Sequence, residues 1–249
     1  MESKFSVPTE EVELPSKGLL YPEDSPLSSG KIEMKYMTAK EEDLLTNQNY
    51  IRNGTVIDRL MKALIVNKDV NYTDLLIGDK NAIMFAARVL SYGKDYEFMY
   101  DEVEQTVDLS ALDLKYLDES LVENRVNEFA FKLPATDNTI TFKLLSHGDE
   151  LNIDREIEGL KKLQKGSSPE STTRLKRMIT SVNGIREIKD IREFVDKYLL
   201  AKDARALRAE YQKVQPDVLM KAQVRNQTGG MEDVDIPINL NFFWPDSGI

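Results

Sequence analysis

Residues 79–93 read Asp-Lys-Asn-Ala-Ile-Met-Phe-Ala-Ala-Arg-Val-Leu-Ser-Tyr-Gly, a run with apolar side chains on nearly every side. A helix that is hydrophobic all round is typical of a buried core position, because no face of it suits water. Asp79 is of the residue type that caps the start of a helix, and Gly93 is of the type that ends one. The stretch therefore predicts the central helix of a folded domain.

Helical patterns lie on both sides of this stretch. Thr38, with Glu41 three residues later, has the form of a capping box and predicts that a helix starts there. Apolar residues then recur at three- and four-residue spacing over 56–65, which predicts a second, core-facing helix. Beyond Gly148 the pattern is helical over three stretches: 149–165, from Pro169 to 183–184, and 187–214.

Short strands are predicted by alternation of apolar and polar residues. The stretches are 11–14 and 31–37, which could pair around a loop at 18–22; 96–107, as one or two strands; 129–133 and 139–144, as a hairpin; and 234–240, as an edge strand beyond a Gly229-Gly230 hinge. Together these elements predict an α+β fold: a predominantly helical domain with short antiparallel strands or hairpins and extended N- and C-terminal segments. We expect four parts: an extended N-terminal segment with strands (1–37), a mixed helical and β domain (38–145), a helical region (146–216) and an extended C-terminal segment with an aromatic tail (217–249).

Composition excludes several classes of function. The 249 residues include 43 acidic and 33 basic side chains, a net charge of −10, so there is no basic surplus for binding nucleic acid or anionic lipid. The absence of cysteine excludes disulfides, thiolate nucleophiles and cysteine-ligated metals. No apolar run has the length of a signal peptide or a membrane span, so we expect a protein that is made and kept soluble.

The sequence offers no recognisable catalytic set. His147 is the only histidine, and we interpret it as a polar residue that leaves the end of a strand. Lys17-Gly18 and Gly78-Asp79-Lys80 lack the spacing of a phosphate loop and are interpreted as turns. The acidic residues Asp101, Glu102 and Glu104 are interpreted as a solvated strand or turn face rather than a cation site. We expect no catalytic residue, no cofactor and no metal.

Two apolar segments are candidates for partner binding. Phe242, Phe243 and Trp244 are of the residue types enriched at interface hot spots, and they stand at a chain end, where most proteins are polar. They either dock on another protein or fold back on this chain. If they dock on a partner, deletion of 241–249 weakens partner binding more than it weakens the fold; equal losses would favour folding back. Leu19, Leu20 and Tyr21 form a similar segment, for which the intramolecular alternative is favoured.

Several motifs together resemble the baseplate hub assembly proteins of T4-like tailed bacteriophages, of the hub assembly catalyst type. They are Leu-Pro-Ser-Lys-Gly-Leu-Leu-Tyr at 14–21, Tyr-Met-Thr-Ala-Lys-Glu-Glu-Asp-Leu-Leu at 36–45, Asn-Tyr-Ile-Arg-Asn-Gly at 49–54, Gly-Asp-Lys-Asn-Ala-Ile-Met at 78–84, Tyr-Gly-Lys-Asp-Tyr at 92–96 and Phe-Phe-Trp-Pro at 242–245. The resemblance is dense over 11–100, sparse through the helical half, and returns at the tail. Some relatives have a Cys-x-x-Cys zinc ribbon after the fifth motif, which this sequence lacks.

This resemblance implies a factor that promotes assembly of the baseplate hub in the host bacterial cytoplasm by binding other hub proteins, without chemical turnover. A structural subunit of the hub, retained in the virion, is the alternative. A third class, an enzyme such as a phosphodiesterase or peptidase, is disfavoured because the nucleophile, base and metal sets are missing. Whether the chain forms a homo-oligomer is left open.

Overall fold

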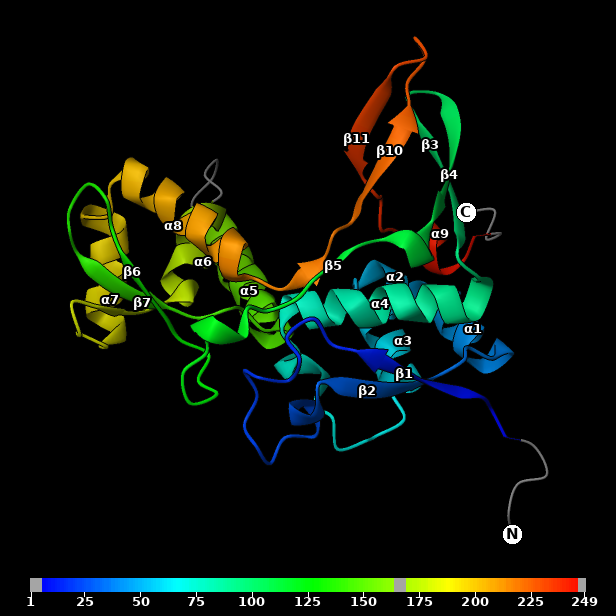
Figure 1. The fold of residues 1–249 in the computed structure, drawn as a ribbon, viewed down its shortest axis with the longest axis horizontal. Helices are drawn as coiled ribbons and strands as arrows, with labels where there is room; N and C mark the ends of the chain where they lie inside the picture. Colours follow the sequence, from blue (N-terminus) through cyan, green and yellow to red (C-terminus); the bar gives the residue numbers. More distant parts are fainter. Residues whose placement is uncertain (1–5, 164–168, 246–249) are drawn as a thin grey trace.

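The central helix is α4, Ile77–Tyr92, which crosses the middle of the molecule (Figure 1). It belongs to a computed structural model that describes residues 6–163 and 169–245. Its buried side chains include Ile83, Phe85 and Ala87, and it ends at Gly93, whose φ of 82° favours glycine. The prediction of a central helix that ends at Gly93 is confirmed.

The start of α4 differs from the prediction. Leu76 is the N-cap, so Asp79 lies within the first turn and does not cap the helix. Gly78, predicted to be in a turn, also lies inside the helix, where a Cβ atom would come within 1.9 Å of the carbonyl oxygen of Pro216. The C-terminal segment therefore crosses the start of α4 in direct contact with its backbone, a long-range contact that no local pattern encodes.

The N-terminal strands pair as predicted. β1 (Thr9–Glu13) and β2 (Lys31–Lys35) form an antiparallel hairpin around a long loop that contains the 3-10 helix η1 (Pro26–Ser29). Gly18 and Gly30 cross inside this loop, and a Cβ atom on Gly18 would lie 2.5 Å from the Gly30 nitrogen. Because both glycines also have positive φ, the crossing requires glycine at the two positions.

Three short helices follow β2: α1 (Ala39–Leu45), α2 (Gln48–Arg52) and α3 (Val56–Leu64). α3 packs against α4, and α1 packs against α3. The predicted capping box is present, since the Thr38 amide and hydroxyl donate to the Glu41 carboxylate over 3.1 and 2.6 Å. The predicted core-facing helix is α3, which buries Val56, Leu60, Met61 and Leu64. The 3-10 helix η2 (Tyr72–Asp74) then leads into α4.

The helical half contains more strand than predicted. Its elements are α5 (His147–Leu163), α6 (Glu170–Met178), α7 (Ile188–Lys197), α8 (Ala201–Val214) and a three-stranded antiparallel sheet of β6 (Phe129–Lys132), β7 (Thr139–Phe142) and β8 (Ile179–Val182). The predicted hairpin of β6 and β7 is confirmed. The segment that forms β8 was predicted to be helical, but Ile179, Thr180 and Val182 are β-branched and favour extension beside β7.

The predicted long helix over 187–214 is two helices, α7 and α8. The break is fixed by a tertiary contact at Asp203, in the first turn of α8. Its fully buried carboxylate accepts hydrogen bonds from the Ala135 amide and the Thr136 hydroxyl, each 2.8 Å long. These bonds tie the start of α8 to the β6–β7 turn, a contact too distant in sequence for periodicity to reveal.

Two further hairpins stand beside each other and project from the body (Figure 1). The first is β3 (Asp95–Tyr100) with β4 (Val103–Asp108), and the second is β10 (Lys221–Arg225) with β11 (Met231–Asp235). We call residues 95–108 and 221–235 the arm. The two-strand alternative for 96–107 is confirmed. Gly229 and Gly230 lie in the turn between β10 and β11 and are not a hinge before a single edge strand.

Smaller elements link the arm to the body. They are the 3-10 helices η3 (Leu109–Ala111) and η4 (Glu119–Leu121), the strand pair β5 (Leu114–Lys115) and β9 (Asp217–Val218), and the helix α9 (Leu240–Phe243). The predicted edge strand over 234–240 therefore ends at Asp235, and the tail is helical at α9. The fold is α+β, as predicted. Within the described residues, no helix combines the length and hydrophobicity needed to cross a bilayer.

The sheet of the helical half provides a pH-dependent contribution to stability. Arg186 forms two 2.8 Å hydrogen bonds with Glu128 and lowers the pKa of that carboxyl to about 2. Because the folded pKa lies below the unfolded one, the contribution is present above pH 4.5 and is lost as pH falls towards 2. Arg186 is 63% exposed, so the effect is at most about 1 kcal/mol. Urea denaturation of Glu128→Gln across this range should show a shallower pH dependence than the unmodified protein; an unchanged slope contradicts the assignment.

Candidate interaction surfaces

The aromatic tail packs inside this chain. The Asn239 side chain caps α9 by accepting from the amides of Asn241 and Phe242, over 2.9 and 3.3 Å. The Phe242 ring is fully buried, and its centroid lies 5.1 Å from that of Phe85 in α4 and 5.0 Å from that of Tyr96 in β3. Edge-on aromatic contacts of this kind stabilise beyond the area that they bury. Phe242 thus joins the base of the arm to the central helix.

This burial corrects the first of our two partner-binding candidates. Phe242 and Phe243 have no exposed surface, so they fold back on this chain rather than present a face to another protein. The physical reason is that α4 and β3 supply an apolar, aromatic site for them within the chain. Trp244 remains half-exposed, and a partner contact through this side chain stays a prediction.

The second candidate segment is also directed inwards. Leu20 and Tyr21 are buried and Leu19 is half-buried. The Tyr21 hydroxyl accepts from the Leu76 amide over 2.9 Å and donates to the Asp79 carboxylate over 2.5 Å. Burial raises the pKa of Tyr21 well above its usual value. Leu20 and Tyr21 hold the N-terminal loop on α4, so we correct their assignment to partner binding; only Leu19 keeps exposed surface.

Asp79 is the centre of that attachment and was missed as a functional position. Besides the Tyr21 hydroxyl, its carboxylate accepts from the Ser16 amide over 2.9 Å and from the Ser16 hydroxyl over 2.6 Å. Burial raises the pKa of Asp79, while these hydrogen bonds act to lower it. All three donors point at one buried carboxylate, which locks residues 16–21 to the first turn of α4.

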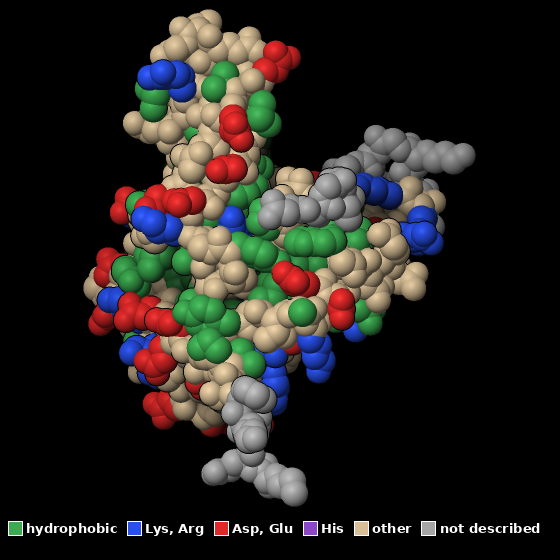
Figure 2. Space-filling model, turned by 90° about the vertical axis from the view of Figure 1, so that its right-hand side faces the viewer, with side chains coloured by type: hydrophobic (Ala, Val, Ile, Leu, Met, Phe, Trp, Pro, Cys, Tyr) green, Lys and Arg blue, Asp and Glu red, His purple; other side chains and the backbone are tan. Residues whose placement is uncertain are grey.

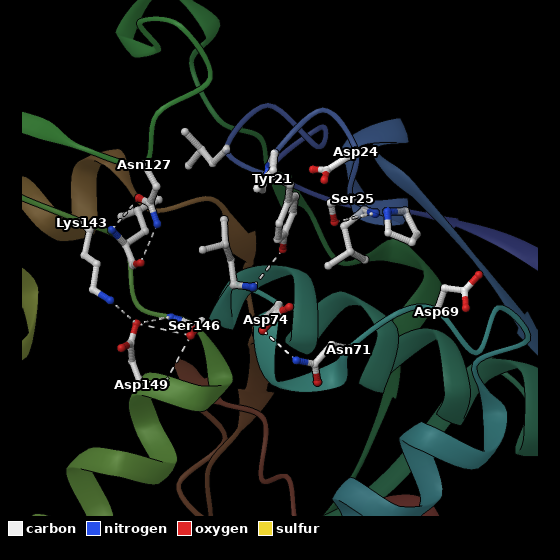
Figure 3. Close-up of a pocket in the computed structure, with 16 residues that line it drawn as sticks. Tyr21, Asp24, Ser25, Asp69, Asn71, Asp74, Asn127, Lys143, Ser146 and Asp149 are labelled. Carbon is white, nitrogen blue, oxygen red and sulfur yellow. Dashed lines mark hydrogen bonds and ion pairs between the residues drawn. The ribbon is translucent and has the colours of Figure 1, made fainter.

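A pocket of about 500 Å³ lies between the N-terminal loop and the start of α5 (Figure 3). Several of its polar side chains are bonded to neighbours. Lys143 forms a 2.7 Å ion pair with Asp149, whose carboxylate also accepts from the Ser146 amide over 3.2 Å. Asn127 exchanges two 2.9 Å hydrogen bonds with the backbone of Leu144. The Ser146 hydroxyl also donates to the Asp149 carboxylate over 3.3 Å, and Lys143 and Arg177 already pair with that carboxylate.

His147 lies at the first position of α5, not at a strand end as predicted, and is buried. Its Nε2 is 2.9 Å from an Asp58 carboxylate oxygen, and its Nδ1 is 3.2 Å from the Lys80 ammonium. Burial acts to raise the pKa of Asp58, but the hydrogen bond from His147 and the nearby lysine charges outweigh it, and that pKa lies below its usual value. With both ring nitrogens engaged, the histidine ties α3, α4 and α5 together and is not placed to activate a nucleophile.

The described residues contain no group of three or more His, Cys, Asp or Glu side chains arranged to hold a metal ion. The polar clusters around Asp79, Asp149 and His147 each consist of groups that satisfy one another. The most prominent exposed element of the described residues is the arm (Figure 1).

The arm contributes buried side chains to the hydrophobic core of the molecule, namely Tyr96, Ala222 and Val224. The Gln105 side chain donates to the carbonyl oxygen of Arg225 over 2.8 Å and accepts from the Arg225 amide over 3.1 Å, so it joins β4 to β10 as a strand pair would. The hairpins are therefore one unit and not two independent loops.

The tips of the hairpins are joined as well. Asp101 and Glu102 form the two-residue turn of the first hairpin with φ of 49° and 60°, angles that usually favour glycine or asparagine. The side chains compensate, because Asp101 accepts from the Gln227 amide over 3.1 Å and Glu102 accepts from the Gln227 side chain over 3.0 Å. The acidic run is thus a structured tip rather than only a solvated face.

The outward faces of the arm are acidic with isolated methionines, and Figure 2 shows the arm standing clear of the body. Met99 and Met231 are 64% and 59% exposed. The arm contains nine acidic and two basic residues: Asp95, Glu97, Asp101, Glu102, Glu104, Asp108, Glu232, Asp233 and Asp235 against Lys221 and Arg225. A projecting element of this charge favours encounter with a basic surface.

Comparison with known proteins identifies the family. A profile of the family described as T4 bacteriophage base plate protein matches residues 8–244. The chain belongs to this family. A search of curated proteins and a search of solved structures each returned no match. The resemblance to T4-like baseplate proteins is therefore confirmed for nearly the whole length of the chain, including the arm and α9.

In this baseplate protein, the sequence patterns did not predict that the two hairpins of the arm pack together. The two hairpins are more than a hundred residues apart in sequence, and nothing local shows that they pair. One signal was available: residues 95–108 contain six acidic side chains and no Lys or Arg, on strands with alternating apolar residues. A hairpin with only acidic charges and with apolar residues along one face needs a packing partner for that face. The pattern therefore indicates an element that packs on one side and is exposed on the other.

Proposed function

We propose that this baseplate protein is a hub assembly factor that binds other hub proteins in the host bacterial cytoplasm and promotes their association without chemical turnover. The observation that carries the proposal is the arm, a projecting pair of hairpins that are joined to each other and have an acidic, methionine-bearing surface. The family match supports the baseplate context.

The base of the arm is fixed, which favours binding. The Arg88 side chain donates to the carbonyl oxygens of Gly93 and Asp95 over 2.7 and 3.0 Å, and the Tyr96 hydroxyl donates to the carbonyl oxygen of Pro237 over 2.9 Å. Together with the Phe242 contacts, these bonds hold the arm in one orientation relative to α4. An element ordered before it meets its partner loses less entropy on binding.

The test uses a tagged copy of the full chain expressed during infection. Purification of the tagged protein from the lysate at low salt should recover hub proteins, and purified virions should lack the chain. Recovery of the chain alone, with hub assembly intact in cells that lack it, would refute the proposal.

A structural subunit retained in the virion is the second candidate. The burial of Phe242 and Phe243 favours it, because a factor that shields apolar partners would be expected to keep its own large aromatics exposed. Detection of the chain in purified virions at a fixed ratio to other hub proteins would select this alternative.

A further inference from the structure

A second surface lies along α4, between β1 and the segment that follows β4. An apolar pocket of about 290 Å³ is floored by one face of α4 and walled by β1 and by the segment that joins β4 to β5. Its apolar lining includes Phe85, Ala86, Val89, Leu90, Leu109 and Leu112. The pocket is small beside typical cofactor sites, and no buried charged side chain lines it to orient a small molecule.

The strand that forms one wall has an unpaired edge. Among the residues that the structure describes, β1 pairs with β2 alone, and Glu11 lies opposite Glu33 in that pairing. The carbonyl oxygen of Glu33 accepts from the Val66 amide over 3.0 Å, on the side of β2 away from β1. In an antiparallel pair, residues directly opposite each other either bond to each other or both point away. The Glu11 N–H and C=O therefore point outward, towards the groove edge.

The rim of the groove is acidic. Glu10, Glu11 and Glu13 line it. The Glu11 carboxylate lies 3.2 Å from the Lys31 ammonium, and its side chain is still 68% exposed. Val12, between them, lies on the face of β1 that packs towards the core. A strand added to β1 would place alternate side chains over the apolar floor and the others beside the glutamates, because strand side chains alternate between faces.

We propose that this groove binds an extended segment of a partner protein by strand addition to β1, with aliphatic residues at alternate positions and basic residues between them. The unpaired backbone provides affinity, the pocket on α4 selects the aliphatic side chains, and the glutamates select the basic ones. This inference is independent of the proposed function of the arm, since it rests on different elements and on an interaction that is measurable with the isolated protein.

The probe is a fluorescent, end-capped heptapeptide of sequence Lys-Val-Lys-Leu-Lys-Val-Lys, titrated against the full chain and followed by anisotropy. The comparison peptide, Lys-Lys-Val-Leu-Val-Lys-Lys, has the same composition and charge without the alternation. We expect the alternating peptide to bind at least about tenfold more tightly. No binding, or equal binding of the two peptides, overturns the proposal.

Two variants locate the site. Glu11→Pro removes the outward N–H and leaves the β1–β2 ladder intact, while Glu11→Gln is its control because it keeps that N–H. Ala86→Leu fills the pocket, with Ala130→Leu, at an exposed strand position, as its control. Each blocking variant should weaken binding about tenfold, and Ala130→Leu less than about threefold. Glu11→Gln removes one of the glutamates that select basic side chains but keeps the outward N–H, so it should weaken binding less than Glu11→Pro does. If the blocking variants have the same Tm as the unmodified protein and still bind the peptide normally, the proposal is overturned.

Other occupants give distinct results. Binding that appears only after removal of residues 1–5 would show that the chain's own terminus fills the groove, and self-association abolished by Glu11→Pro would show that a second copy does. Either outcome refutes a partner segment as the ligand. Failure of the arm to bind hub proteins would leave these measurements unaffected.

Discussion

Replacing Asp79 with alanine is expected to lower the free energy of unfolding by about 4 kcal/mol, a large loss for a single side chain. The carboxylate is fully buried and accepts three hydrogen bonds, two from Ser16 and one from Tyr21. Its removal leaves all three donors without an acceptor, away from water. Unsatisfied buried groups cost more than the net value of the bonds they lose.

Urea denaturation of Asp79→Ala measures this loss. Tyr21→Phe is the matched variant, since it removes one donor and keeps the carboxylate, and it should cost about 1 to 2 kcal/mol. The two changes should be non-additive in the double variant, because they share a contact. A loss below about 1 kcal/mol for Asp79→Ala would show that the N-terminal loop is not held on α4 through this group.

Replacing Phe242 with alanine is expected to cost about 4 kcal/mol and to loosen the arm. The ring is fully buried between Phe85 and Tyr96, so truncation leaves a cavity at the junction of α4 and β3. Phe242→Leu, which retains most of the volume, should cost less. Hydrogen exchange of the β3 amides should accelerate in the alanine variant because the base of the arm loses its packing.

This expectation replaces the one drawn from sequence alone. A tail that only docks on a partner would lose binding on deletion of 241–249 and keep its stability. A buried tail loses both. Unchanged stability of Phe242→Ala together with lost partner binding would contradict the intramolecular packing and restore the first interpretation.

The elements that sequence predicted are those with local causes. The capping box at Thr38 and Glu41, the apolar face of α3 and the end of α4 at Gly93 each depend on residues within a few positions of one another. The β1–β2 and β6–β7 hairpins were likewise predicted, because alternation and turn residues are adjacent in the chain.

The elements that sequence did not predict depend on distant partners. Asp79 is of the capping residue type, but its acceptor role is set by Ser16 and Tyr21, about sixty positions earlier. Asp203 divides α7 from α8 through a contact with the β6–β7 turn. The tail aromatics gave a strong signal of burial, yet the sequence could not state whether the site for them was in this chain or in another.

The arm connects the fold to the proposed function. Its hairpins come from two distant segments, its base is held by Arg88, Tyr96 and Phe242, and its outer faces are left to solvent. A baseplate protein with a fixed, acidic projection of this kind is suited to meet basic surfaces of neighbouring subunits, and charge at such a surface acts chiefly on encounter and specificity.

The central claim is that hub proteins bind the arm. The most direct test replaces three exposed arm carboxylates that form no ion pair with any described residue, as Glu97→Lys, Glu104→Lys and Asp233→Lys together. It measures the hub protein recovered with the tagged chain from infected cells. The control makes the same charge change on the body, as Asp43→Lys, Glu123→Lys and Glu158→Lys. We predict that recovery falls at least about tenfold for the arm variant and stays near the unmodified level for the control. Equal recovery with the two variants, both folded, would contradict the claim.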